Sequence, residues 1–348
     1  MYNEKFMKRA LKIAFKGTGK VNPNPLVGAV ITDGSKIISE GYHKVYGDKH
    51  AEVNAVEEAE KRGISVKGKD IYVTLEPCSH FGKTPPCADM IIKKGFKNVY
   101  IGIKDPNPAV NGRGIKKIID SGINTEYGFY EDEIKIQNKF FIKNMKLKKP
   151  YITLKTAITL DGFIADRKEN SKWISNERSR NYVHINRYKH MSVMAGSRTV
   201  IKDNPELNVR FSGKTVKSPI RIILDKDNLI KNNKYKIFNE NGKNILITPV
   251  KVFDSENTDF IITEDFTSEN IIKEISLRNI DSVFIEGGAG IYESFFDCTD
   301  YFMIFTAPKI FSSGKKAFEF ADNRIFDIKE INVFDDNVCW EAEKCLPE

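Results

Sequence analysis

The sequence predicts an α/β protein of two domains, and three observations support this. The chain has 348 residues, whereas a single hydrophobic core usually stops growing near ~250 to 300 residues. Strand-like runs of Val, Ile and Leu alternate with helical patterns along most of its length. A lysine-rich segment at 139–150 ends at Pro150 and separates two such series. We therefore expect domains at residues 1–146 and 147–348, joined by a basic linker.

The first domain shows helices and strands in alternation. Helical patterns cover residues 3–16, 51–62 and 88–94, and strand patterns cover residues 26–32, 37–42, 70–75 and 99–103. The first two strands are separated by Asp33-Gly34, which is typical of a tight hairpin turn. This order predicts a layered α/β domain.

The second domain contains short strands separated by helical or loop segments. The strand patterns cover residues 151–156, 192–195, 220–224, 244–248, 282–285 and 301–307. Runs this rich in Ile, Val and Leu favour mostly parallel strands with crossover helices.

Composition excludes several classes of protein. Apolar residues make up 41% of the chain, which is enough for folded cores, and no window approaches the ~18 apolar residues of a membrane span. Residues 1–20 form a charged amphipathic pattern without the unbroken apolar core of a signal peptide. We expect a cytoplasmic protein without a membrane partner.

The net positive charge is confined to the first domain. Residues 1–150 carry 27 Lys and Arg against 17 Asp and Glu, a net charge of +10, whereas residues 151–348 carry 28 against 30. A basic domain could bind nucleic acid or a small anionic substrate. A solvated lysine-rich surface explains the same excess, so charge alone does not decide the function.

The strongest constellation is His50-Ala51-Glu52 followed by Pro77-Cys78 and Cys87. The chain has five cysteines, and a reducing cytoplasm disfavours disulfides. One imidazole and two thiolates fill three positions of a tetrahedral zinc and leave the fourth open, which is typical of a catalytic site. Zinc lowers the pKa of a bound water from 15.7 to ~7. A carboxylate at Glu52 could then carry the proton from that water to a leaving amine.

Helix geometry restricts where this site can lie. Residues two apart on a helix point in roughly opposite directions, so His50 and Glu52 can converge only at the N-terminal end of their helix. Cys87 follows Pro85-Pro86 and precedes a helical pattern, which places it at a second helix start. The dipoles of both helices would favour ionised thiolates there.

The motif matches the zinc deaminase pattern of H-x-E followed by P-C, with one difference. Eight residues separate Cys78 from Cys87, whereas the usual spacing is C-x-x-C. The intervening segment should loop out beside the metal and offer His80 and Lys83 to a substrate.

These segments closely resemble the bifunctional deaminase-reductases of riboflavin biosynthesis. The matching runs are NPNPLVG at 22–28, HAEV at 50–53, TLEPCSH at 74–80, TPPC at 84–87 and DPNP at 105–108. The resemblance implies a cytidine-deaminase-like three-layer domain that removes the 2-amino group from a diaminopyrimidinone with a phosphoribosylamino arm. It implies substrate contacts from Asn24, His43, His80, Lys83 and Asn107, with Lys83 near the phosphate. Asn24 and Asn107 adjoin prolines, so they could instead be turn residues.

The second domain lacks the G-x-G-x-x-G fingerprint of a Rossmann nucleotide site. A strand at 282–285 instead runs into Gly287-Gly288-Ala289-Gly290. Backbone amides at such a helix start could bind a pyrophosphate, although a plain tight turn explains the glycines equally well.

The runs LKTAITLDG at 154–162, SKWIS at 171–175, GSRTV at 196–200 and DNPELNVR at 203–210 resemble the reductase half of the same family, whose fold is like dihydrofolate reductase. The resemblance implies NADPH contacts from Ala157, Trp173, Thr199, Asp203, Asp225, Gly288, Ala289, Gly290, Ile291, Tyr292, Glu293 and Ser294. It implies substrate contacts from Ser171, Arg187, Leu207, Arg210 and Glu286. Both arginines suit a phosphate, because guanidinium groups bind its oxygens bidentately.

Two short stretches depart from the family pattern, Phe163 and Thr299-Asp300-Tyr301. They leave the metal set intact and put only local contacts in doubt. The residues do not identify a general acid for reduction, and Lys155 and Asp203 are the candidates.

The sequence therefore predicts zinc-dependent hydrolytic deamination of 2,5-diamino-6-(5-phosphoribosylamino)pyrimidin-4-one, followed by NADPH-dependent reduction of its ribosyl chain to ribityl. We expect a homo-oligomer acting on this small phosphorylated pyrimidine, without a nucleic-acid partner. One alternative keeps the zinc site but takes tRNA or another nucleic acid, which a salt-sensitive affinity for RNA would favour. The other is a binding protein with a structural metal, which would have no need of Glu52.

The choice between NADPH and NADH depends on charge near the second domain's cofactor. Asp225 follows the strand at 220–224, and a carboxylate there would by itself favour NADH. Ser197, Arg198, Thr199 and Lys202 offer donors and positive charge after a neighbouring strand. The sequence therefore predicts NADPH.

Overall fold

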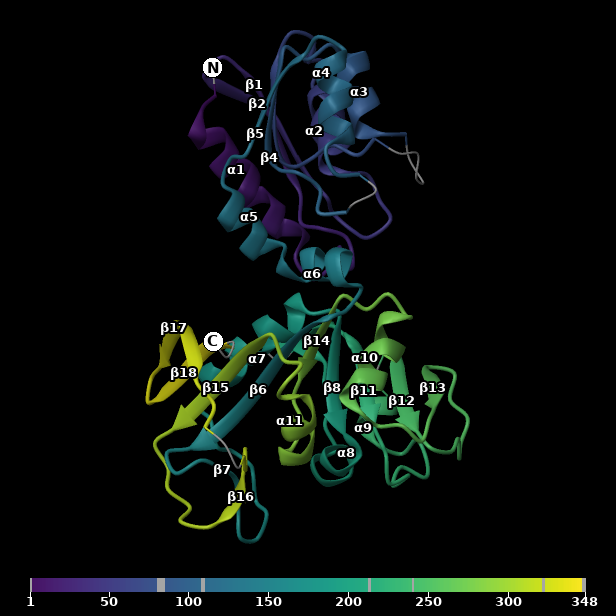
Figure 1. Ribbon diagram of the computed structural model, residues 1–348, viewed down its shortest axis with the longest axis vertical. Helices are drawn as coiled ribbons and strands as arrows, with labels where there is room; N and C mark the ends of the chain where they lie inside the picture. Colours follow the sequence, from purple (N-terminus) through teal and green to yellow (C-terminus); the bar gives the residue numbers. More distant parts are fainter. Residues whose placement is uncertain are drawn as a thin grey trace. The chain divides into compact units, whose positions relative to one another are not determined.

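The computed structural model describes residues 2–79, 85–107, 110–211, 214–239, 241–320 and 323–345. The chain divides into two compact units, Met1–Lys148 and Lys149–Glu348 (Figure 1). Each unit has its own main sheet. Within the described part of the chain, no helix combines the length and apolar character needed to cross a membrane.

The first unit is built on a five-stranded sheet of order β2-β1-β3-β4-β5. Its strands are β1 (Gly28–Asp33), β2 (Lys36–Tyr42), β3 (Asp70–Leu75), β4 (Asn98–Ile103) and β5 (Asn124–Tyr127). β1 pairs antiparallel with β2 and β3, whereas β3, β4 and β5 run parallel. The carboxyl ends of β3 and β4 therefore meet at one edge of the sheet.

Helices cover both faces of this sheet (Figure 1). They are α1 (Glu4–Ala14), α2 (Ala51–Lys61), α3 (Cys87–Lys94), α4 (Arg113–Asp120), α5 (Glu131–Gln137) and α6 (Lys139–Leu147), with a 3-10 turn, η1 (Phe15–Gly17), after α1. Alternate strand residues face opposite layers: Tyr72 and Tyr100 pack with Phe6 of α1, whereas Ile71 and Val99 pack with α2, α3 and α4. The unit is a three-layer α/β/α sandwich.

The segment before Pro150 differs from the sequence prediction. A basic linker was expected at residues 139–150, but residues 139–147 form α6. Phe141 is buried there in a cluster with Leu75, Ile103 and Ile134. The many lysines of this helix led to the prediction of a linker, although the helix has an apolar face that packs within the first unit.

The second unit is built on a nine-stranded sheet of order β13-β12-β11-β8-β14-β6-β15-β18-β17. The strands of the unit are β6 (Tyr151–Thr159), β7 (Phe163–Asp166), β8 (Ser192–Gly196), β9 (Val209–Phe211), β10 (Lys214–Lys217), β11 (Ile220–Leu224), β12 (Asn244–Thr248), β13 (Thr258–Ile262), β14 (Ser282–Ile285), β15 (Tyr301–Ala307), β16 (Gly314–Lys316), β17 (Phe326–Phe334) and β18 (Asn337–Lys344). β13 through β15 are parallel neighbours, and β18 and β17 add antiparallel strands at one end. This confirms the mostly parallel sheet.

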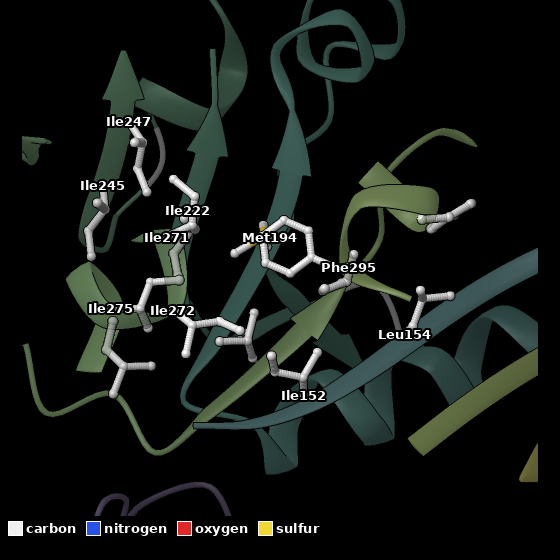
Figure 2. Close-up of a cluster of buried hydrophobic side chains, with 14 of the residues drawn as sticks. Ile152, Leu154, Met194, Ile222, Ile245, Ile247, Ile271, Ile272, Ile275 and Phe295 are labelled. Carbon is white, nitrogen blue, oxygen red and sulfur yellow. The ribbon is translucent and has the colours of Figure 1, made fainter. Parts of the chain in front are cut away.

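The faces of the large sheet are covered by α7 (Glu177–Lys189), α8 (Ser197–Asp203), α9 (Lys236–Asn239), α10 (Ser268–Ser276) and α11 (Ala289–Phe295). Figure 2 shows one of the two apolar layers, where Ile152, Met194 and Ile222 of the strands meet Ile271 of α10 and Phe295 of α11. On the opposite layer, Val183 of α7 packs with Val193, Phe284 and Phe305. Both layers fix the carboxyl ends of β6, β8 and β14 at one edge of the sheet.

Candidate active sites

Three ligand atoms converge where α2 and α3 begin. His50 Nδ1 lies 3.6 Å from Cys78 Sγ and 3.4 Å from Cys87 Sγ, and all three ligand atoms lie within 4.8 Å of one another. His50 is the N-cap of α2, Cys87 is the first residue of α3, and Cys78 follows β3. One nitrogen and two sulfur donors at this separation fit a zinc ion held by three protein groups.

Hydrogen bonds link the three groups. The thiol of Cys87 donates a hydrogen bond to Cys78, which lowers the pKa of Cys78 to about 4 and raises the pKa of Cys87. The backbone N–H of Cys87 donates to Cys78 Sγ at 3.3 Å, and the hydrogen bond to Cys78 raises the pKa of His50 to about 9. Zinc binds thiolates and neutral imidazole, so metal binding should release protons from this cluster.

Glu52 is the second residue of α2 and is buried beside the three ligands, with 3% of its surface exposed. Burial raises the pKa of its carboxyl to about 7, while the positive charge of His50 acts in the opposite direction. A carboxyl group with a pKa near neutrality can both take up and release a proton at physiological pH.

Asn24 and His43 form a polar pair next to this cluster. Asn24 Nδ2 lies 3.1 Å from His43 Nε2, and His43 Nδ1 lies 3.1 Å from the carbonyl oxygen of Lys49. Burial lowers the pKa of His43, which favours the neutral ring. Because a carbonyl oxygen only accepts, Nδ1 carries the proton and Nε2 accepts from Asn24. The ring of His43 meets His50 edge-on with centroids 5.7 Å apart.

The remaining predicted substrate contacts of the deaminase are His80, Lys83 and Asn107. His80 and Lys83 lie outside the described residues. Asn107 follows β4, and its backbone N–H donates to Asp105 Oδ1 at 2.8 Å. The segments after β3 and β4 run side by side, because the N–H of Glu76 donates to the Ile103 carbonyl at 2.9 Å.

In the second unit, the loops after β8 and β14 approach each other closely. A Cβ on Gly196 would lie 2.9 Å from Ile291, and one on Gly287 would lie 2.8 Å from the same side chain. A Cβ on Gly288 would lie 3.8 Å from Thr199 Oγ1. The glycine turn and the start of α8 therefore share one surface. Tyr292 points away from it, because its ring belongs to the buried core.

A buried ionic cluster lies beside these loops. Arg187 Nε and Nη2 each lie 2.8 Å from Glu286 Oε1, and Arg187 also donates to the carbonyl of Asn208. Burial lowers the pKa of Lys155, and the charge of Glu286 opposes that shift. The structure thus brings Arg187, Glu286 and the Leu207–Asn208 segment together.

The two predicted phosphate arginines differ in accessibility. Arg187 is buried and its guanidinium is held by protein acceptors, so the expectation that it grips a phosphate fits the structure poorly. The side chain of Arg210 is 39% exposed and pairs with Glu206. His184, which the sequence did not single out, accepts the backbone N–H of Arg210 at 3.2 Å. The sequence could not indicate this contact, because His184 is a single histidine on α7 that belongs to no recognised motif.

The other predicted residues of the reductase lie on β6, at the end of α8 and on the loop between β7 and α7. Trp173 is 63% exposed, and the Arg180 guanidinium lies 4.5 Å from its ring centroid. Next to it, Lys172 Nζ donates to the carbonyl of Asp203 at 3.2 Å, which joins this loop to the end of α8. Ala157 lies in the carboxyl-terminal half of β6, and Ser171 precedes the Trp173 loop.

Asp225 is fully buried, unlike a ligand-facing carboxylate. Its two oxygens accept the backbone N–H groups of Leu229 and Ile230 at 2.8 and 2.9 Å. This carboxylate therefore holds the loop after β11, and its presence gives no reason to favour NADH.

Two family models divide the chain between them. Residues 1–103 match the cytidine and deoxycytidylate deaminase zinc-binding region, and residues 150–340 match the RibD C-terminal domain. The riboflavin biosynthesis protein RibD of Aquifex aeolicus is 40% identical over 319 residues, which is 90% of this chain and 88% of that protein. This chain belongs to the RibD family.

Other RibD proteins match over nearly the full length. The Escherichia coli RibD protein is 32% identical over 97% of this chain and 98% of its own. A crystal structure from Thermotoga maritima superposes with a TM-score of 0.92 at 39% identity, covering 98% of both chains. That protein is described as a diaminohydroxyphosphoribosylaminopyrimidine deaminase and 5-amino-6-(5-phosphoribosylamino)uracil reductase.

Membership of the RibD family confirms the main expectations from the sequence. The chain combines a zinc-binding deaminase domain with a reductase domain, and the three-layer and dihydrofolate-reductase-like folds agree with it. The chain is a bifunctional enzyme of riboflavin biosynthesis, with zinc and NADPH as its cofactors. The cluster of His50, Cys78 and Cys87 lies within the region matched by the zinc-binding model.

The metal site can be tested by removing one ligand. We expect about one zinc per wild-type chain and a marked loss of zinc in Cys87→Ser, because two remaining ligands hold the metal less tightly. Metal analysis of the purified proteins measures this. Cys298→Ser is the matched control, since Cys298 is a cysteine of the other unit. Full zinc occupancy in Cys87→Ser would remove this residue from the ligand set.

Proposed function

We propose that residues 1–146 carry the deaminase and residues 147–348 the reductase, each acting at the site described within its own unit. For the deaminase, the supporting observation is the convergence of three zinc-type ligand atoms next to a buried carboxyl. The substrate is 2,5-diamino-6-(5-phosphoribosylamino)pyrimidin-4-one, in keeping with the reaction named for the Thermotoga relative.

In this proposal, the chain's own residues position the pyrimidine and move one proton. Zinc, when bound by His50, Cys78 and Cys87, supplies a Lewis acid that makes water nucleophilic at neutral pH. Glu52 takes the proton of the attacking water on its carboxylate and delivers it to the departing amine. His43 orients Asn24, whose side-chain oxygen accepts a hydrogen bond from the pyrimidine ring of the substrate. His80, Lys83 and Asn107 complete the contacts with the substrate.

The role of Glu52 can be tested by removing its charge alone. Glu52→Gln should keep zinc and fold but lose deamination by ~10² to 10⁴ fold, the usual range for general acid-base catalysis. Ammonia release from the pyrimidine measures this loss. Glu58→Gln, on an exposed position of α2, is the matched control and should retain activity. Wild-type turnover in a zinc-loaded Glu52→Gln protein would exclude Glu52 from proton transfer.

For the reductase, we propose that NADPH lies along the edge formed by β6, β8 and β14. Ala157, Trp173, Thr199, Asp203 and the loop of Asp225 would contact it. Gly288 and the α11 residues Ala289, Gly290, Ile291, Tyr292, Glu293 and Ser294 would complete the contacts, Tyr292 through its backbone because its ring is buried in the core. NADPH supplies the hydride that converts ribosyl to ribityl. The close approach of Gly288 to Thr199 supports a shared phosphate-binding surface, where backbone amides suit a pyrophosphate.

The substrate of the reductase would lie against Ser171, Leu207, Arg210 and the Arg187–Glu286 pair. Arg210 is the arginine that can meet the phosphate, since its side chain is partly exposed. Arg187 Nε donates to Glu286 Oε1 at 2.8 Å. Burial would raise the pKa of Glu286, but the charges of Arg187 and Lys155 lower it and keep the carboxyl group ionised. Glu286 can then accept hydrogen bonds from ribose hydroxyls.

Preference for NADPH over NADH should depend on Arg198 and Thr199. The side chain of Arg198 is 77% exposed beside Asp227 at the start of α8, where it can meet the ribose phosphate of NADPH. Arg198→Ala or Thr199→Ala should therefore reduce the preference, measured as oxidation of each cofactor with the deaminated substrate. Arg178→Ala removes a similarly exposed arginine paired with Asp335 and serves as control. Equal or better rates with NADH in the wild-type enzyme would contradict the assignment.

We also propose that the protein is a cytoplasmic homo-oligomer that binds neither nucleic acid nor membrane. The support for the homo-oligomer is an apolar surface on the last hairpin: Ile331 and Val333 of edge strand β17 are 53% and 67% exposed, and Trp340, paired with Ile331, is 37% exposed. Exposed apolar groups on an unpaired strand edge favour association with a second copy. Sedimentation should give a mass above that of one chain for wild type and a smaller mass for Ile331→Lys. A wild-type monomer would contradict this proposal.

A further inference from the structure

Glu76 is a buried carboxylate between the zinc ligand Cys78 and the end of β3. Only 3% of its surface is exposed, and its side chain accepts four backbone N–H groups. Oε2 accepts from Asp105 at 3.1 Å and from Gly112 at 2.9 Å, and Oε1 accepts from Gly114 at 2.9 Å and from Ile115 at 3.2 Å. One side chain thus binds both the loop after β4 and the start of α4.

The start of α4 lacks a capping side chain of its own. Its N-cap is Gly112, and the first N–H groups of a helix need acceptors from outside the helix. Glu76, which follows β3, accepts the N–H groups of Gly114 and Ile115 in the first turn of α4. The helix dipole favours a negative charge at this position. The contact is close, since a Cβ on Gly114 would lie 2.0 Å from the carbonyl oxygen of Pro77. α4 is therefore attached directly to the segment that leads into Cys78.

Asn107 lies between the two parts held by Glu76. On one side, Asp105 Oδ1 accepts the N–H of Asn107 at 2.8 Å. On the other, the carbonyl of Asn107 accepts the N–H groups of Val110 and Asn111, both at 2.9 Å, just before the N-cap Gly112. The residues bonded to Asn107 thus lie at Asp105 or just before Gly112, and the N–H groups of Asp105 and Gly112 both donate to Glu76 Oε2.

We propose that Glu76 is a positioning residue of the deaminase, which acts through Asn107. Its carboxylate fixes the Asn107 loop relative to the strand end that carries Cys78, and so sets the distance between substrate contact and metal. Glu76 itself touches neither substrate nor metal in this role. The inference rests on the proposed contact of Asn107 with the pyrimidine, and the experiment below tests the two separately.

The test is Glu76→Gln, alone and combined with Asn107→Ala. A glutamine amide turns one acceptor into a donor that faces backbone N–H groups, so part of the loop is released. We expect the KM for the pyrimidine to rise ~10-fold, by analogy with the ~10- to 100-fold loss of affinity or activity that follows removal of a group that orients a metal ligand. The kcat, the zinc content and the reductase rate of the same chain should stay near wild type. Glu40→Gln, which breaks the ion pair with Arg9, should leave KM unchanged.

The double variant decides whether the effect passes through Asn107. If it does, Glu76→Gln adds little once Asn107→Ala is present, because coupled residues are not additive. Additive effects, or a wild-type KM in Glu76→Gln, would overturn the proposal. A wild-type KM in Asn107→Ala alone would instead remove the proposed Asn107 contact.

Gly114→Ala disturbs the same junction without changing the carboxylate, and it carries the test if Glu76→Gln does not fold. The added Cβ would force the start of α4 away from Pro77. We expect the same rise in KM, and again no further rise on the Asn107→Ala background. Loss of zinc with an unchanged KM would show that the junction serves the metal and would overturn the proposal.

Discussion

The alignment of parallel strand ends is the constraint on which both sites depend. In a parallel pair, the carboxyl ends lie at the same edge, and the helices that follow begin there with unpaired N–H groups. β3 and β4 bring the segments of Cys78 and Asn107 together, while α2 and α3 begin beside them. β8 and β14 do the same for Thr199 and Gly288. The two proposed sites thus share one structural arrangement, each in its own sheet.

Helix starts explain why negative groups can be buried at these edges. Cys78 Sγ accepts the backbone N–H of Cys87 at the first residue of α3, and Glu76 accepts N–H groups at the start of α4. Desolvating an anion is costly unless donors replace the lost water. Glu286 is stabilised by side-chain charges and not by a helix start. Burial would raise its pKa, but the charges of Arg187 and Lys155 lower it. Glu52 has less compensation, which is why burial raises its pKa.

Much of the fold could be read from the sequence, because the central strands are strongly apolar. β3, β11, β12, β14 and β15 coincide with predicted runs, and the starts of α2 and α3 follow from the placement of His50 and Cys87. β5 was missed because its residues are mostly exposed and carry no clear apolar period. β17 was missed although its apolar residues alternate with polar ones, because the alternation shifts by one residue between Ile328 and Ile331. The lysines of α6 concealed a buried Phe141.

The site residues divide along a similar line. Metal ligands are recognisable because zinc demands particular residue types, whereas the partners of Arg187, the loop held by Asp225 and the four bonds of Glu76 depend on segments far apart in sequence. The family resemblance placed Arg187 and Asp225 at ligands, and residue type suggested that Arg187 binds a phosphate and that a carboxylate at Asp225 could favour NADH. The fold instead gives each a protein partner, since burial leaves no other way to satisfy their charge.

The central claim is that one chain holds two independent sites, of which only the first requires a metal. The most direct measurement follows ammonia release from the diaminopyrimidine and NADPH oxidation with the deaminated product, in the same preparation, before and after treatment with a zinc chelator. The account predicts that chelation abolishes ammonia release, that NADPH oxidation continues, and that added zinc restores deamination. Ammonia release that persists in zinc-free enzyme, or reduction that fails together with deamination, would contradict it.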